Sequence, residues 1–219
     1  MNEIISKSYA VLSDKLGRVA RRYWRNRHER SLLKNKQFTI FSQNCIGSVM
    51  YHDLGEQFLS PTVNLMMRPK DFITFLKNIQ HYLEQPLTFV DSQKTYPEAL
   101  LGNDILISFV HYKSNHEAEE AWKRRKERIN WQNIFVICCD EGLDEQDIVD
   151  FEELPFQNKI LFVSQKNASF SGSSAVICNE YEEKTDARLL NFSSPSGERF
   201  YQKYIDYVAF LNGEDNYRK

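Results

Sequence analysis

The chain is poor in glycine, proline and cysteine, and it contains no long apolar run. Only 8 Gly and 6 Pro occur among 219 residues, which argues against fibrous or low-complexity structure. None of the 4 Cys belongs to a CxxC pair, so the sequence predicts neither a zinc site nor a disulfide framework. A membrane span needs about 18 consecutive apolar residues and a signal peptide needs an apolar core, and the sequence has neither. We therefore expect a cytoplasmic protein.

Several motifs of well-known enzyme classes are also missing. The sequence contains no GxxxxGK phosphate loop, no GxGxxG dinucleotide motif, no GxSxG nucleophile elbow and no D-x-D triplet. These absences disfavour P-loop hydrolases, dinucleotide enzymes, elbow-type serine hydrolases and glycosyltransferases that hold a nucleotide sugar through an acidic triplet. We expect no bound metal. The formal net charge of -2 gives no electrostatic reason to expect a nucleic-acid partner.

The composition is that of a globular protein. Hydrophobic residues make up 42% of the chain, with 15 Phe, 11 Tyr and 3 Trp, and this length is enough for one sizeable core. The first 36 residues differ in composition from the rest. We therefore divide the chain into a terminal segment, 1–36, and one α/β domain, 37–219.

The segment 1–36 is predicted to form a basic amphipathic helix. Between Asp14 and Lys36 it carries nine Lys or Arg against two acids. Apolar residues recur at steps of three and four and form one narrow stripe: Leu12, Leu16, Val19 and Tyr23. One interpretation packs this stripe on the domain and leaves the arginines in solvent. A second places the helix on an anionic membrane surface, and a third gives it another polyanion as partner.

After this helix, short apolar runs alternate with amphipathic helical patterns. Strands are expected near 38–41, 62–67, 87–90, 105–110, 134–139, 160–163 and 175–178, with a loop or hairpin at 96–104. Helices are expected near 49–58, 69–83, 115–130, 145–152 and 197–211. This alternation predicts an α/β fold with a mainly parallel sheet covered by helices on both faces. Ligands of such folds bind beyond the carboxyl ends of the strands.

Polar residues capable of chemistry follow most of these predicted strands, so we expect them to converge on one pocket. The residues directly after the strands are Ser42, Gln43, Asn44, Cys45, Arg68, His111, Tyr112, Lys113 and Asp140. Tyr51, His52 and Asp53 lie about two helical turns past the first strand. Asp140 has the position of a metal- or ribose-binding acid in many α/β enzymes, and we expect it to be catalytic together with His111 and His52.

The polar turn Ser42–Ser48 is the centre of the predicted site. If a helix begins near Ile46, its free backbone N–H groups favour a phosphate or a developing oxyanion, and Gly47 lets the backbone approach a ligand. Cys45 is either a nucleophile activated by a histidine or a small buried thiol that packs the turn.

Two histidines are candidate general bases. His111, at a strand end, is the better placed, and Lys113 would share its side and bind a phosphate or a carboxylate. His52 and Asp53 are neighbours on a helix, where side chains point about 100° apart, so we expect them not to pair.

Three runs of the sequence resemble one known bacterial family. They are FTIFSQNCIGSVMYHDLGEQFLSPTVNLMMRPKDFITFLKNI, FVHYKSNHEAEEAWKRRKERINWQNIFVICCDEGLDEQDI and FEELPFQNKILFVSQ, and the likeness extends from Phe38 to Phe210. The family is the domain-of-unknown-function family nineteen-nineteen, whose members are encoded in capsule and exopolysaccharide gene clusters and are sometimes called acetyltransferases. Where family members usually have Trp and a second Gly in the turn, this chain has Ile46 and Ser48.

The resemblance implies an α/β fold and a role in surface-polysaccharide synthesis. Our first hypothesis is a transferase that modifies or extends a sugar, with acyl transfer ahead of glycosyl transfer and acyl-CoA or a nucleotide sugar as donor. Its substrate would be a sugar or a lipid-linked saccharide. The second hypothesis is a non-catalytic adaptor that binds a polysaccharide precursor or an assembly enzyme at the inner face of the membrane.

Overall fold

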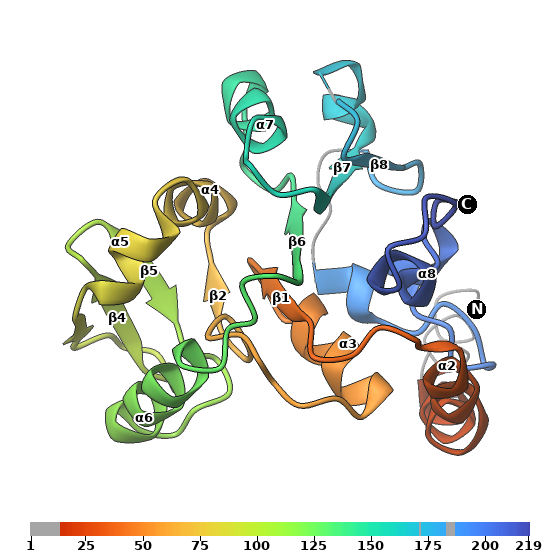
Figure 1. Cartoon of the computed structure of the whole chain (residues 1–219), viewed down its shortest axis with the longest axis horizontal. Coiled ribbons are helices and arrows are strands. Elements are labelled where there is room, and N and C mark those ends of the chain that lie inside the picture. Colours follow the sequence, from red (N-terminus) through yellow and green to blue (C-terminus); the bar gives the residue numbers. More distant parts are fainter. Residues whose placement is uncertain (1–13, 171, 183–186) are drawn as a thin grey trace, which may run out of the picture. The chain divides into compact units, whose positions relative to one another are not determined.

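The computed structural model describes residues 14–170, 172–182 and 187–219 (Figure 1). Its backbone divides into two compact units. What we call the terminal unit consists of the described part of Met1–Lys36 together with Val49–Glu56 and Ala187–Lys219. The sheet unit consists of Gln37–Ser48 and Gln57–Asp186. Each unit is described by itself below.

A four-stranded parallel sheet forms one part of the sheet unit. Its strand order is β1 (Thr39–Ser42), β6 (Ile134–Cys139), β7 (Asn158–Ser164), β8 (Ala175–Cys178). The strand β6 is buried along almost its whole length, as the continuous apolar run predicts for a central parallel strand. Helix α7 (Glu145–Glu152) connects β6 to β7, which is the crossover that parallel neighbours require.

The remaining strands of the described residues form a four-stranded antiparallel sheet. Its order is β2 (Met66–Met67), β5 (Ile105–Ser108), β4 (Glu98–Leu101), β3 (Leu87–Val90). The prediction of a mainly parallel sheet is therefore wrong for this half of the sheet unit. Only residues 102–104 connect β4 to β5, with Gly102 at φ 71°, and such a short turn can join only antiparallel neighbours.

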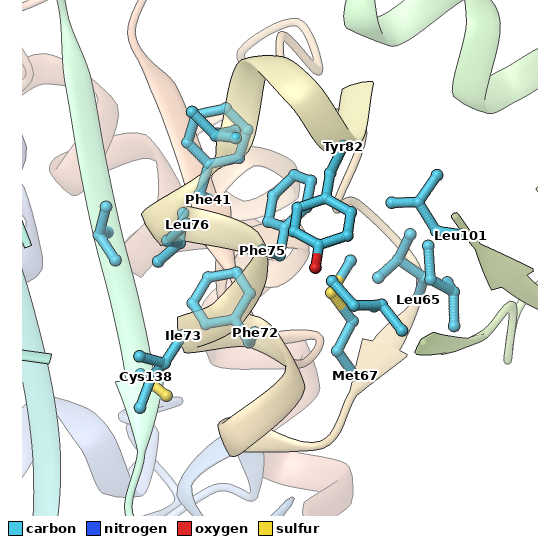
Figure 2. Packing of buried hydrophobic residues seen from close by; sticks show 14 of the residues in the cluster. Phe41, Leu65, Met67, Phe72, Ile73, Phe75, Leu76, Tyr82, Leu101 and Cys138 are labelled. Atoms are coloured by element: carbon cyan, nitrogen blue, oxygen red, sulfur yellow. The ribbon is translucent and has the colours of Figure 1, made fainter. Parts of the chain in front are cut away.

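Helix α4 (Pro69–Lys77) supplies much of the core of the sheet unit. Proline starts the helix at its first turn, where a missing N–H costs nothing. Figure 2 shows Phe72 and Phe75 among apolar side chains that come from both sheets, including Cys138 of β6 and Leu101 of β4. The predicted helix 69–83 is interrupted at Asn78, after which α5 (Ile79–Glu84) continues. Helix α6 (Asn115–Lys126) adds Trp122 to the same core, and Ser114 caps it.

The terminal unit is built from short helical pieces. Residues 14–20 are helical and lead into a π-helix, η1 (Arg21–Arg25), and then α2 (Asn26–Leu32). The C-terminal part contributes η3 (Ala187–Leu190), η4 (Phe200–Lys203) and α8 (Tyr207–Leu211). The single helix predicted over 197–211 is wrong, because the Asp206 side chain accepts from Val208 N and Ala209 N and starts α8 anew.

The apolar stripe of the N-terminal helical segment faces solvent. Leu16 is 48% exposed, Val19 51%, Tyr23 61% and the adjacent Trp24 73%, while Leu12 lies outside the described residues. The buried positions of this segment are instead Gly17, Arg21, Asn26, Glu29 and Leu33. Within the terminal unit, the described part of the stripe therefore does not pack on the protein as the first interpretation expects. Among those residues, no helix has the length and apolar character to cross a membrane.

Candidate functional site

The turn after β1 leads directly into α3 (Ile46–Leu54). Asn44 Oδ1 accepts a hydrogen bond from Ile46 N at 2.9 Å, and Ser42 Oγ accepts one from Gly47 N at 3.4 Å. The first two amides of α3, expected to be free for a ligand, are thus engaged by side chains of the turn itself. Asn44 and Ser42 therefore fix the conformation in which Cys45 is presented.

Gly47 is required by packing. A Cβ at this position would lie 3.0 Å from Ile40 Cγ2 and 3.0 Å from Ser42 Cβ. A side chain here would fit only if Ile40 or Ser42 moved by a few tenths of an ångström. The glycine thus permits close contact between helix and strand, and the space over it is filled by protein.

Cys45 and His111 meet in the sheet unit. Cys45 Sγ lies 3.4 Å from His111 Nε2, although the two residues come from different turns, one after β1 and one three residues past the end of β5. Cys45 is half-buried and His111 is exposed. Burial raises the pKa of the Cys45 thiol to about 11, so the thiol form predominates near neutral pH. Attack by the sulfur then requires a base that takes its proton, and His111 Nε2 is in position to do so.

The two residues that follow His111 differ in exposure: Tyr112 is buried and Lys113 is exposed. The Tyr112 hydroxyl is buried, donates to Val63 O at 3.2 Å and accepts from Arg125 NH1. Burial raises its pKa, against the opposing field of Arg125. Lys113 is exposed and lines a second cavity of about 430 Å³ with Ser114. Tyr112 therefore ties α6 to the core, while Lys113 remains available to a ligand of the second cavity.

Asp140 joins the ends of two parallel strands. Its Oδ2 atom accepts from Ser164 N at 2.8 Å, from Ser164 Oγ at 2.6 Å and from Asn167 Nδ2 at 3.0 Å. The residue is 1% exposed. These bonds satisfy a buried carboxylate and give Asp140 a positioning role at the carboxyl edge of the sheet.

Arg68 lies at a larger cavity, of about 510 Å³, in the sheet unit. Its guanidinium donates to both carboxylate oxygens of Asp71, at 2.8 and 3.1 Å. The same cavity is lined by Gln43, directly after β1, and by Glu141, after β6. A cavity is therefore present beyond the carboxyl ends of β1 and β6, where the α/β fold predicts a ligand to bind. The sequence indicates only that Gln43 follows a strand. It does not show which neighbours surround the Gln43 side-chain amide.

Tyr51, His52 and Asp53 belong to the terminal unit. Tyr51 is 1% exposed and His52 is exposed. His52 Nδ1 lies 3.4 Å from Asp53 Oδ1, so the expectation that these neighbours do not pair is wrong: a side chain can turn back towards the adjacent residue.

Asp53 takes part in a buried ion network that centres on Arg21. Arg21 Nε donates to Asp53 Oδ2 at 2.7 Å, and Arg21 NH2 donates to Glu29 Oε2 at 2.8 Å. Arg199 Nε also donates to Asp53 Oδ2, at 3.0 Å. Burial opposes ionisation of Asp53, but the fields of Arg21 and Arg199 outweigh it and lower the pKa of the carboxyl. This arrangement makes Asp53 a structural anion of the terminal unit.

Arg21 itself is 2% exposed and is fully used by neighbours within the terminal unit. Its NH1 atom donates to Gly197 O at 2.8 Å and to Gln202 Oε1 at 2.6 Å. Arg21 is one of the nine Lys or Arg between Asp14 and Lys36, and the interpretation as a basic helix packed on the domain predicts an exposed side chain for it. Its position on the helix could have indicated burial, because Arg21 lies opposite the apolar stripe and that opposite side is the buried one.

Of the predicted site residues, the structure brings Cys45 and His111 into contact and places Ser42, Asn44 and Gly47 in the turn beneath them. Arg68 lines the larger cavity and Lys113 the second one. Among the described residues, no group of three or more His, Cys, Asp or Glu side chains is arranged to hold a metal ion.

Comparison with known proteins gives a match over nearly the whole chain. The family model "Domain of unknown function (DUF1919)" matches residues 16–212. An "Uncharacterized protein" of Haemophilus influenzae (strain ATCC 51907 / DSM 11121 / KW20 / Rd) is 39% identical over 193 residues, which cover 87% of this chain and 92% of that protein. The family match spans Arg21, Cys45 and His111.

Proposed function

This chain belongs to the DUF1919 family, and from that premise we propose that it is a transferase that acylates a sugar during capsule or exopolysaccharide synthesis. The observation that carries the proposal is the 3.4 Å contact between Cys45 Sγ and His111 Nε2. A thiol beside an imidazole is the combination that acyl transfer through a thioester requires. It favours acyl transfer over glycosyl transfer, which needs no thiol nucleophile.

The reaction proceeds in two balanced steps from an acyl thioester donor such as an acyl-CoA. In the first, Cys45 Sγ bonds to the acyl carbon, His111 Nε2 takes the thiol proton, and the donor thiolate leaves with that proton. In the second, a sugar hydroxyl oxygen attacks the acyl carbon on Cys45, and His111 takes the hydroxyl proton. The proton then passes to the departing Cys45 sulfur, so both residues return to their starting forms.

Side chains of the turn and of the neighbouring strand ends hold their backbone in place. Asn44 and Ser42 hold the turn that carries Cys45, and Asp140 links the carboxyl ends of β6 and β7. Because the pKa of the Cys45 thiol is high, little thiolate is present before the reaction. His111 therefore takes the thiol proton during the attack itself. Lys113, at the second cavity, offers a cation to a phosphate-bearing donor.

The test is donor consumption by the Cys45→Ala variant. Purified protein is mixed with acetyl-CoA and a panel of uncharged monosaccharides, and released CoA is measured by chromatography. We expect the wild-type protein to release CoA in the presence of an acceptor sugar. Cys45→Ala should lose this activity by about 10³-fold or more, because the nucleophile is gone. Equal CoA release by Cys45→Ala and wild type would refute the mechanism, provided that thermal melting shows both proteins folded.

A second candidate function is membrane-surface attachment, which would suit an adaptor as well as an enzyme. It is supported by the exposed stripe of Leu16, Val19, Tyr23 and Trp24. Exposed bases lie in the same segment: Lys15, Arg18, Arg22 and Arg27. Apolar groups of this kind enter the headgroup boundary while each Lys or Arg near an anionic surface adds about 1 kcal/mol.

Vesicle binding tests this second candidate. We expect the protein to sediment with vesicles that contain phosphatidylglycerol and not with pure phosphatidylcholine. The double variant Val19→Ser, Trp24→Ser should bind about tenfold or more weakly, because it removes the two apolar groups from the membrane boundary. Val149→Ser, an exposed apolar position on α7, is the matched control and should bind like wild type. Equal binding by all three proteins would rule out the stripe as the contact.

Point substitutions are preferable to removal of residues 1–36. Arg21 and Glu29 belong to the buried ion network, so truncation would disrupt the terminal unit as well as the exposed face. A truncated protein that fails to bind vesicles would therefore be uninformative.

A further inference from the structure

The larger cavity of the sheet unit has the dimensions and the position of a ligand site. Its volume of about 510 Å³ falls within the range of roughly 300–1,000 Å³ that small-molecule pockets occupy. Gln43 follows β1, Arg68 follows β2 and Glu141 follows β6, and all three line it. The cavity therefore lies at the carboxyl ends of β1 and β6 of the parallel sheet, where ligands of α/β proteins bind, and beside the end of β2 of the antiparallel sheet.

Gln43 is the unusual residue of this cavity. Its backbone N donates to Ile137 O at 3.2 Å, and its backbone O accepts from Met67 N at 2.9 Å, so it joins the two sheets. The side chain is 4% exposed, and its Oε1 atom has no hydrogen-bond partner among the described residues. A buried amide oxygen without a partner is costly, which calls for an explanation. The terminal amide torsion is soft, so the group can turn towards a donor in the cavity.

The two cations at the cavity form ion pairs within the protein. Arg68 is paired in bidentate fashion with Asp71, which also lines the cavity. Lys70 Nζ lies 3.0 Å from Asp147 Oδ1 and 3.6 Å from Asp144 Oδ2. Both cations are engaged by carboxylates of the protein, which weighs against a nucleotide or a coenzyme as the occupant.

The uncharged part of the wall combines apolar and polar groups. Met67, Pro69 and Leu106 contribute apolar surface, and Gln43 and Ser108 contribute neutral polar groups. A saccharide has matching chemistry, because its C–H face packs on apolar side chains while its hydroxyls donate to an amide oxygen.

From this geometry we infer that the cavity is a binding site for an uncharged saccharide, with a sugar hydroxyl donating to Gln43 Oε1. Its role as the acceptor site rests on the acyl transfer proposed above. Binding itself does not depend on that reaction. The site thus gives the proposed transferase a preference for neutral over acidic or phosphorylated sugars.

Saturation-transfer NMR and calorimetry on the full chain test the inference without any acyl donor. The probes are methyl glycosides of uncharged hexoses and N-acetylhexosamines, compared with glucuronic acid and glucose 6-phosphate. We expect binding of at least one neutral glycoside and about tenfold or more weaker binding of the charged sugars. Gln43→Leu keeps the backbone bonds and removes the amide, and should weaken neutral-sugar binding about tenfold or more. Gln132→Leu, an exposed position before β6, is the matched control.

The melting temperature of Gln43→Leu shows whether weaker sugar binding comes from a folding defect. Gln43→Leu removes the unpartnered oxygen, so its melting temperature should equal or exceed that of wild type. No neutral glycoside bound by wild type, or equal affinity of Gln43→Leu and wild type, would overturn the inference. Assaying acyl transfer by the same wild-type protein distinguishes the two proposals: sugar binding without acyl transfer would reject the transferase and keep the saccharide site.

Discussion

Replacing Arg21 by Met is expected to destabilise the terminal unit by about 3–5 kcal/mol. The substitution leaves the carboxylates of Asp53 and Glu29 buried without the guanidinium that both contact, and breaking a buried pair from one side costs this much. Urea denaturation followed by circular dichroism measures the loss. Hydrogen exchange locates it, with protection expected to fall first at the backbone amides of Val49–Glu56 and Ala187–Lys219.

The neighbouring residue provides the control for this prediction. Arg22 is exposed on the same helical segment, so Arg22→Met should change the free energy of unfolding by less than about 0.5 kcal/mol. Equal stability of Arg21→Met and Arg22→Met would show that the buried ion network does not stabilise the protein.

The ion network also makes the stability depend on pH. Because the pKa of Asp53 is lowered in the folded protein, its stabilising effect is present above its unfolded pKa and is lost as the pH falls through the folded value.

Replacing His111 by Ala is expected to lower acyl transfer by about 10²- to 10⁴-fold at neutral pH, because general base catalysis is lost. The pH profile identifies the cause. Burial raises the pKa of Cys45 to about 11, so in His111→Ala the thiolate fraction, and with it the rate, should rise about tenfold per pH unit towards that value. In the wild-type protein His111 accepts the proton, so its rate should depend much less on alkaline pH.

The histidine of helix α6 serves as the control for His111. His116 is exposed, and His116→Ala should keep wild-type activity and pH profile. If His111→Ala and wild type had the same rate and the same pH profile, the contact with Cys45 would be structural only.

Sequence patterns predicted the parallel part of the fold better than the antiparallel part. The apolar run at 134–139 has the length and composition of a buried central strand, and it forms β6. Periodicity cannot tell whether short strands pair in parallel. The loop or hairpin expected at 96–104 is a hairpin of β4 and β5, whose short turn at 102–104 forces the antiparallel order. The C-terminal helix was predicted too long because the capping carboxylate of Asp206 was overlooked.

The candidate site was predictable in outline only. The position of both residues after predicted strands made Cys45 and His111 candidates, but their contact depends on a strand order that the sequence does not state. Asp53 and Tyr112 are candidate substrate-binding residues by the same pattern, yet both are buried and bonded to arginines. The distinction between a functional and a structural polar residue depends on burial and partners, which arise from tertiary packing.

The intact mass of the protein after incubation with acetyl-CoA, without acceptor sugar, tests the central claim most directly. The proposed mechanism predicts a mass increase of one acetyl group, located on the peptide that contains Cys45 and discharged when an acceptor sugar is added. Cys45→Ala should show no increase. An unchanged wild-type mass, or an acetyl group on another residue while Cys45 remains free, would contradict it.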